Sequence, residues 1–116
     1  MTGGRTKLPN RRPCETHVIE VEGQPFTLSF GRDPQTGDVL EVFICGPKIG
    51  SHMDAVLDDA SILVSRCLQA GMPASELRRS MSRMPRYLAG PATEPASPIG
   101  VALFLLDDLI REGGQP

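Results

Sequence analysis

The turn at residues 46–51, GPKIGS, is the stretch whose residue types are best suited to hold a ligand. Gly46 and Gly50 would let the backbone approach a bound group closely, and Lys48 adds a positive charge. Ser51 begins a predicted helix, and the first N–H groups of a helix can bind an anion. The spacing is not that of the GxxxxGK[ST] phosphate loop. Two interpretations stay open: a strand-to-helix turn that needs glycine, or a phosphate or nucleotide site made of Gly46, Lys48, Gly50, Ser51 and His52.

Histidine and cysteine give little support for catalysis or metal binding. His52 has no second His or Cys near it in the sequence, and we interpret it as a solvated or capping residue. The three cysteines are far apart and form no CxxC pair, so we expect neither a metal site nor a disulfide framework. Cys45 and Cys67 fall in apolar patterns and are predicted to be packing residues, whereas Cys14 is predicted to be exposed.

Paired carboxylates occur twice, at Asp58-Asp59 and Asp107-Asp108. Neighbouring residues on a helix point about 100° apart, so such a pair does not converge on one metal ion. We interpret both pairs as solvated helix faces.

Four arginines form a candidate basic patch: Arg78, Arg79, Arg83 and Arg86. Together with the basic N-terminal segment they could bind phosphate groups, or they could form salt bridges with the acidic helix faces. The whole chain has a net charge of −2, four Phe, one Tyr and no Trp. Because nucleic-acid binders need basic surfaces and aromatic platforms, we do not expect nucleic acid to be the ligand.

The elements that position these residues begin with strands predicted at 16–22, 25–30 and 39–45. Short turn-rich links between them favour an antiparallel meander. The third strand is apolar on both faces, which is typical of a central or doubly covered strand.

Three helices are predicted to follow. The first begins at Ser51 and ends at Gly71, and its apolar stripe predicts packing on the sheet. The stripe consists of Met53, Val56, Leu57, Ala60, Leu63, Val64, Cys67 and Leu68. The second helix is predicted at 73–84, between two prolines, and a Pro-rich loop at 85–97 follows it.

The third helix is predicted to begin after Ser97, with Pro98 in its first turn. It is apolar nearly all round, so it must be buried, and a small sheet with two short helices would cover only part of it. We therefore expect Val101, Leu105 and Leu109 to lie at a subunit or partner interface.

The expected fold is α+β: a three-stranded antiparallel β-meander followed by three α-helices packed mainly on one face. Residues 1–15 are predicted to be a flexible basic arm, 16–113 a single domain, and 114–116 a tail. The arm is either solvated or in contact with phosphate or another protein. A polar N-terminus, no long apolar run and no cysteine framework lead us to expect a cytoplasmic protein without a membrane segment.

The order of these elements resembles the TSCPD domain, over residues 12–112. The glycine–lysine–any–glycine–serine turn of that family looks like Gly46, Lys48, Gly50 and Ser51 here, with Pro47 as an extra residue. The family's Ala/Leu-rich helix and its glycine–hydrophobic–proline ending look like residues 55–73. The family's Thr-Ser-Cys-Pro-Asp sequence matches 96–99, where only Ser97 and Pro98 remain.

The resemblance implies a link to adenosylcobalamin-dependent (class II) ribonucleotide reductases, which carry this module at their C-terminal end. The family's Cys and Asp are missing, and three dispersed cysteines cannot supply a reductase's radical and reducing thiols. We therefore expect a non-catalytic accessory module that reaches adenosylcobalamin only through a partner reductase. The alternative is a small self-associating or nucleic-acid- or phosphate-binding protein of a phage or mobile element. An independent enzyme is a third reading.

Overall fold

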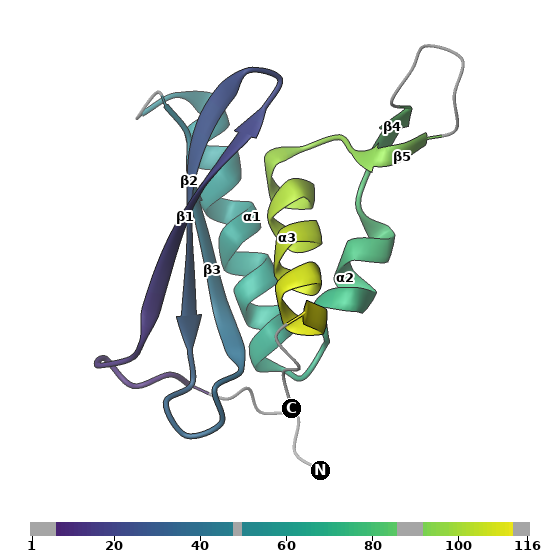
Figure 1. Cartoon of the computed structure of the whole chain (residues 1–116). Helices are drawn as coiled ribbons and strands as arrows, with labels where there is room; N and C mark the ends of the chain where they lie inside the picture. The colour runs from purple at the N-terminus through teal and green to yellow at the C-terminus, as the bar shows by residue number, and fades with distance from the viewer. Residues whose placement is uncertain (1–6, 48–49, 86–91, 113–116) are drawn as a thin grey trace.

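The computed structural model describes residues 7–47, 50–85 and 92–112. Three strands, β1 (Cys14–Val21), β2 (Gln24–Arg32) and β3 (Val39–Cys45), form an antiparallel sheet in the order β1-β2-β3. The helices are α1 (His52–Gln69), α2 (Ala74–Ser80) and α3 (Pro98–Glu112). Figure 1 shows the sheet on one side of the molecule and the helices on the other. The predicted α+β fold, a meander followed by three helices, is confirmed.

The strand register explains which face of the sheet is buried. Phe30 pairs with Val42 and Leu28 with Ile44, so these four side chains point to the same face. All four are almost fully buried, and they pack against Leu103 and Leu106 of α3. Figure 1 shows α3 between the sheet and α2, which explains how an almost entirely apolar helix is covered within one chain.

The opposite face of the sheet carries no described helix. Val18 is 74% exposed and Phe43 41% exposed, and Cys45 also lies on this side. The prediction that Cys45 is a buried packing residue is therefore wrong. β3 is an edge strand rather than the central strand that its apolar sequence indicated.

The hydrogen bonds of α1 explain how an edge strand can be so apolar. Ser65 Oγ accepts a hydrogen bond from Val42 N–H (2.9 Å) and donates one to the Val42 carbonyl (3.1 Å). Ser61 Oγ accepts from Ile44 N–H (3.2 Å), and Gln69 Nε2 donates to the Leu40 carbonyl (3.0 Å). A side chain every fourth residue of α1 therefore satisfies the free edge of β3, where another strand would otherwise pair.

This arrangement corrects the predicted stripe of α1. Only Leu57, Val64 and Leu68 of the stripe are buried in the core, and Cys67 is half-buried against it. Met53, Val56 and Leu63 are exposed instead. The sheet side of the helix is occupied by the polar residues Ser61, Ser65 and Gln69, which are not part of the apolar stripe.

The predicted ends of α1 are confirmed. Ser51 is the N-cap, and its hydroxyl accepts a hydrogen bond from Asp54 N–H. At the other end, Gly71 has φ +100°, and the N–H groups of Gly71 and Met72 donate to the carbonyls of Leu68 and Cys67. This pattern is the Schellman motif that usually ends a helix at glycine.

The region between the second and third helices differs from the prediction. α2 ends at Ser80, not at residue 84, and β4 (Arg83–Pro85) pairs antiparallel with β5 (Ala92–Pro95). Pro85 disfavours a helical conformation at the residue before it, which helps to explain the early end. Part of the predicted 85–97 loop is therefore strand. The start of α3 is as predicted: Ser97 Oγ accepts from Gly100 N–H and Pro98 is the first helical residue.

Candidate functional site

The structure describes part of the predicted ligand turn before α1; Lys48 lies outside the described residues. Gly46 packs closely, since a Cβ there would lie 3.3 Å from the Phe26 ring. Gly50 has φ +82°, a conformation that favours glycine. His52 is an exposed residue in the first turn of α1.

A carboxylate lies beside the N-terminus of α1. Asp54 Oδ2 accepts a hydrogen bond from Gly50 N–H at 3.1 Å, and Asp54 N–H donates to Ser51 Oγ at 3.1 Å. The negative charge of Asp54 suits the helix dipole and would repel a bound phosphate. The anion site at this turn stays a prediction, and the described geometry favours the interpretation as a capped strand-to-helix turn.

The candidate basic patch is divided between one arginine that joins two helices and others that are exposed. Arg78 Nη1 lies 2.8 Å from Asp107 Oδ2, and its guanidinium carbon lies 4.2 Å from the centroid of the Phe104 ring. Arg79 is 76% exposed and only 3.9 Å from Glu76. Arg83 is exposed, 5.5 Å from the Phe104 centroid, and Arg86 lies outside the described residues. Arg78 therefore joins α2 to α3, whereas Arg79 and Arg83 face solvent.

The prediction that the pair Asp107-Asp108 forms a solvated helix face is wrong for Asp107. Its side chain is 5% exposed and also lies 3.0 Å from Arg111 Nη2. Asp108 is mainly exposed and 3.4 Å from Arg78. A buried carboxylate needs such partners, because an unpaired charge would be strongly destabilising there.

One ionic cluster was not anticipated from the sequence. On the inner side of the sheet, Glu15 Oε1 accepts from Arg32 Nε at 2.8 Å, and Glu15 Oε2 lies 2.9 Å from His17 Nε2. The hydrogen bond from His17, followed by that from Arg32, lowers the pKa of Glu15. The alternation of β1 indicates that Glu15 and His17 share a face, but Arg32 reaches them only through the β1–β2 register.

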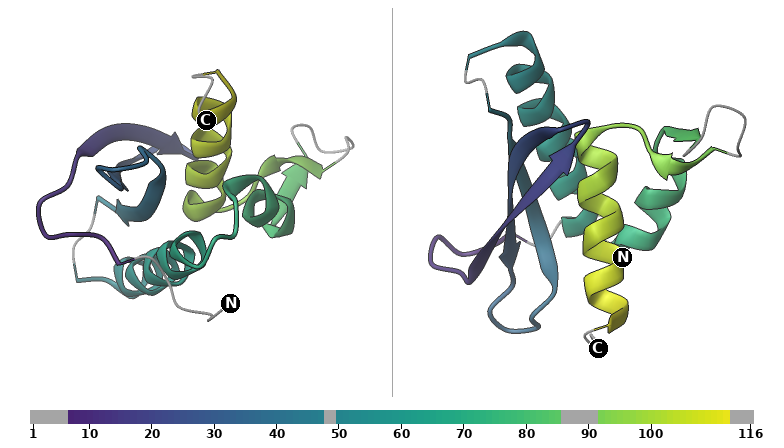
Figure 2. Two further views of the ribbon diagram at one scale, coloured as in Figure 1. Left: turned by 90° about the horizontal axis from the view of Figure 1, so that it is seen from below. Right: turned by 45° about the horizontal axis from the view of Figure 1, so that its top comes forward.

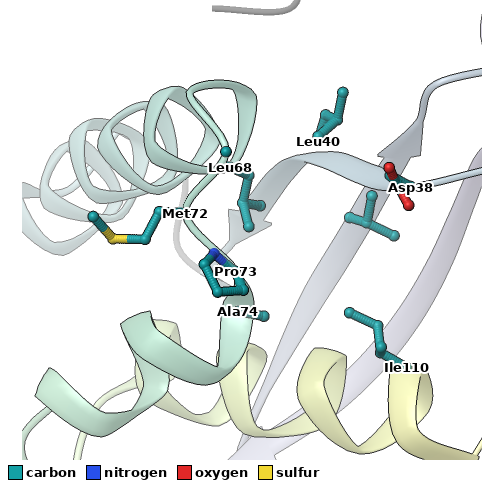
Figure 3. Close-up of a pocket in the computed structure, with 9 residues that line it drawn as sticks. Asp38, Leu40, Leu68, Met72, Pro73, Ala74 and Ile110 are labelled. Carbon is teal, nitrogen blue, oxygen red and sulfur yellow. The ribbon is translucent and has the colours of Figure 1, made fainter. Parts of the chain in front are cut away.

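A shallow apolar recess of about 250 Å³ lies where α1 meets α2. Figure 3 shows Leu68, Pro73 and Ala74 on one side of it, with Leu40 and Ile110 across from them and the Asp38 carboxylate at its edge. Ligand pockets usually enclose about 300 Å³ or more, so this recess suits one side chain of a partner better than a nucleotide.

The residues predicted at an interface on α3 are half-buried. Leu105 and Leu109 pack against the core, and Val101 is half-buried as well. Their role at an interface stays a prediction. The larger exposed apolar side chains lie on α1, on the outer face of the sheet and, at Met72, in the link between α1 and α2.

Within the described part of the chain, no group of three or more His, Cys, Asp and Glu is arranged to hold a metal ion. No helix in those residues is both long and apolar enough to cross a membrane. What the described residues do offer is surface: an uncovered sheet face, an exposed helix face and a small apolar recess. These features belong to an α+β domain.

Comparison with known proteins supplies the family. The family model of the TSCPD domain matches residues 4–106, most of the chain, so the chain belongs to the TSCPD domain family. The resemblance to the TSCPD domain that the sequence indicated is confirmed. No curated protein and no solved structure matched the chain.

Proposed function

We propose that this chain is a non-catalytic accessory module of deoxyribonucleotide synthesis, and hence of DNA replication, that acts by binding a partner protein in the cytoplasm. The first candidate partner is an adenosylcobalamin-dependent ribonucleotide reductase. The observation that carries the proposal is the TSCPD match over residues 4–106. In this role the chain binds no cofactor itself, and adenosylcobalamin belongs to the partner.

The outer face of the sheet is the surface that we assign to the partner. Val18 and Phe43 are large apolar residues exposed there, and Thr27 and Ser29 separate them on β2. Isolated exposed apolar residues are common, but two large ones on one uncovered face favour a contact surface. The phosphate-binding alternative receives less support, because the negative charge of Asp54 lies beside the helix start that would hold the anion.

The test is titration of the purified chain into the adenosylcobalamin-dependent reductase encoded in the same genome, followed by light scattering and calorimetry. We expect a complex that Val18→Asp together with Phe43→Asp abolishes. Glu20→Gln, an exposed change on the same face of β1, is the matched control and should leave binding unchanged. If the chain, with or without bound nucleotide, does not bind the reductase, the assignment is refuted.

A further inference from the structure

The exposed side of α1 carries an apolar seam with coiled-coil spacing. The seam residues are Met53, Val56, Ala60, Leu63, Cys67 and Ala70. They follow one another at intervals of three and four, the spacing that keeps a stripe facing a second helix. Val56 is 61% exposed and Leu63 67% exposed, values far above those of the core residues on the same helix. The left view of Figure 2 shows α1 along the lower edge of the fold, with no described helix or strand outside it.

We propose that this seam binds the seam of a second copy of the chain, so that two α1 helices pack antiparallel about a two-fold axis. The proposal does not rest on the reductase link. A two-fold interface uses the same surface on both copies, so the surface must be complementary to itself. Side-chain size and charge provide two independent tests of that requirement.

Side-chain size meets the requirement in one antiparallel register. If Ala60 faces the partner's Leu63, then Val56 faces the partner's Cys67, and Met53 faces the partner's Ala70. Each layer then joins a larger side chain to a smaller one, which fills space without overpacking. A parallel pairing would instead place Ala60 opposite the partner's Ala60 and Leu63 opposite the partner's Leu63. Layers of two small side chains would then alternate with layers of two large ones.

Charge selects the same register. Asp59 and Arg66 are both exposed and lie seven residues apart on the flank of the seam that faces away from the core. Neither makes an ion pair with a side chain in the described part of the chain. In the antiparallel register Asp59 faces the partner's Arg66, and the two-fold axis repeats this pair. A parallel register would place Asp59 beside the partner's Val64, which is buried in its own core, so this charge pair would not form.

The length of the seam suits such a dimer. α1 has 18 residues, so it is about 27 Å long, and the seam spans nearly all of it. On its other flank lie Leu57 and Val64, which are buried in the core. The partner helix would therefore extend an apolar layer that already begins inside the domain.

The first experiment measures the mass of the isolated chain by sedimentation equilibrium over a range of concentrations. We expect self-association to twice the chain mass of 12.5 kDa. Leu63→Glu places a charge next to the two-fold axis in both copies and should raise the dissociation constant at least about tenfold. Ile62→Glu is the matched control: Ile62 is also an exposed apolar residue of α1, 46% exposed, but it lies about 100° away from the seam. Far-UV circular dichroism confirms that each variant is folded.

Two further variants test the register. Asp59→Arg and Arg66→Asp should each weaken the dimer, and the double variant should restore it. Val56→Cys should allow mild diamide oxidation to link position 56 to the partner's Cys67, which mass spectrometry identifies as a cross-link between two different tryptic peptides. A wild-type chain that stays monomeric at millimolar concentration would overturn the proposal, and so would equal weakening by Ile62→Glu. A cross-link between the two copies of position 56 would overturn the antiparallel register.

Discussion

At the level of single residues, Ser61 and Ser65 connect the helices to the sheet. Both hydroxyls are buried and both accept hydrogen bonds from the outward N–H groups of β3. Their small size lets α1 approach the strand edge closely, and their oxygen atoms satisfy donors that no neighbouring strand satisfies.

Ser65→Ala should therefore lower the free energy of unfolding by about 1–3 kcal/mol, because Val42 N–H would remain buried without its acceptor. Urea denaturation measures the change, and amide hydrogen exchange should accelerate at Val42 before other residues of β3. Ser80→Ala, at an exposed position near the end of α2, is the control and should change stability by less than about 0.5 kcal/mol. Equal effects of the two changes would contradict the proposed edge contact.

The ion pairs of Glu15 should make the free energy of unfolding depend on pH. Its pKa is lower in the folded chain than in the unfolded chain, so its bonds to His17 and Arg32 stabilise the fold above the unfolded pKa of about 4.3. This contribution is lost as the pH falls through the lower, folded pKa. Because the side chain is 36% exposed, we expect Glu15→Gln to lower the free energy of unfolding at pH 7 by no more than about 1 kcal/mol.

The measurement is urea unfolding of the wild type and Glu15→Gln at pH 7 and at pH 3, with Glu20→Gln as the control on the same strand. The difference between the wild type and Glu15→Gln should become smaller at pH 3. A difference that stayed constant or increased would show that the carboxylate charge is not the cause.

At the level of elements, the sequence predicted where α1 and α3 begin but not which side of α1 is buried. Capping residues such as Ser51 and Ser97 act locally, so local pattern is enough to find them. The orientation of α1 depends instead on the backbone groups at the free edge of β3, which form hydrogen bonds with Ser61, Ser65 and Gln69. For that reason the apolar spacing of α1 wrongly indicates that the exposed residues Val56 and Leu63 belong to the core.

A salt bridge between α2 and an acidic helix face was one alternative left open by the sequence. The sequence could not select Arg78 and Asp107 for it, because the two residues are almost thirty positions apart. Arg78→Ala should lower the free energy of unfolding by about 2 kcal/mol, because the buried Asp107 carboxylate would keep only Arg111 as an ion-pair partner among the described residues. The Phe104 ring would also lose the guanidinium that covers it. Thermal or urea unfolding provides the measurement.

Arg79→Ala is the matched control for that change. Arg79 is the next residue of the same helix and is 76% exposed, so we expect an effect below about 0.5 kcal/mol. If the two variants were equally stable, the buried ion pair would not hold α2 on α3.

At the scale of the whole molecule, one core joins all the major elements. β2 and β3 contribute Leu28, Phe30 and Ile44, while α3 contributes Leu103 and Leu106. The candidate site was less predictable than this core. Short-range pattern indicated the turn at residues 46–51, but the exposed surfaces follow from which faces the core leaves uncovered. That outcome is decided only when the whole chain has folded.

Because the sheet and the helices share this core, we expect them to unfold in one cooperative step. Leu28→Ala in β2 and Leu103→Ala in α3 remove fully buried side chains, so each should lower the free energy of unfolding by about 2–5 kcal/mol. In both variants, far-UV circular dichroism and the NMR signals of β1 should report the same midpoint. Val18→Ala, at a position 74% exposed, should leave the midpoint almost unchanged. A helix transition that survived loss of the sheet signals would mean that α1, α2 and α3 hold together without the strands, and that the edge contact between α1 and β3 is weaker than its hydrogen bonds indicate.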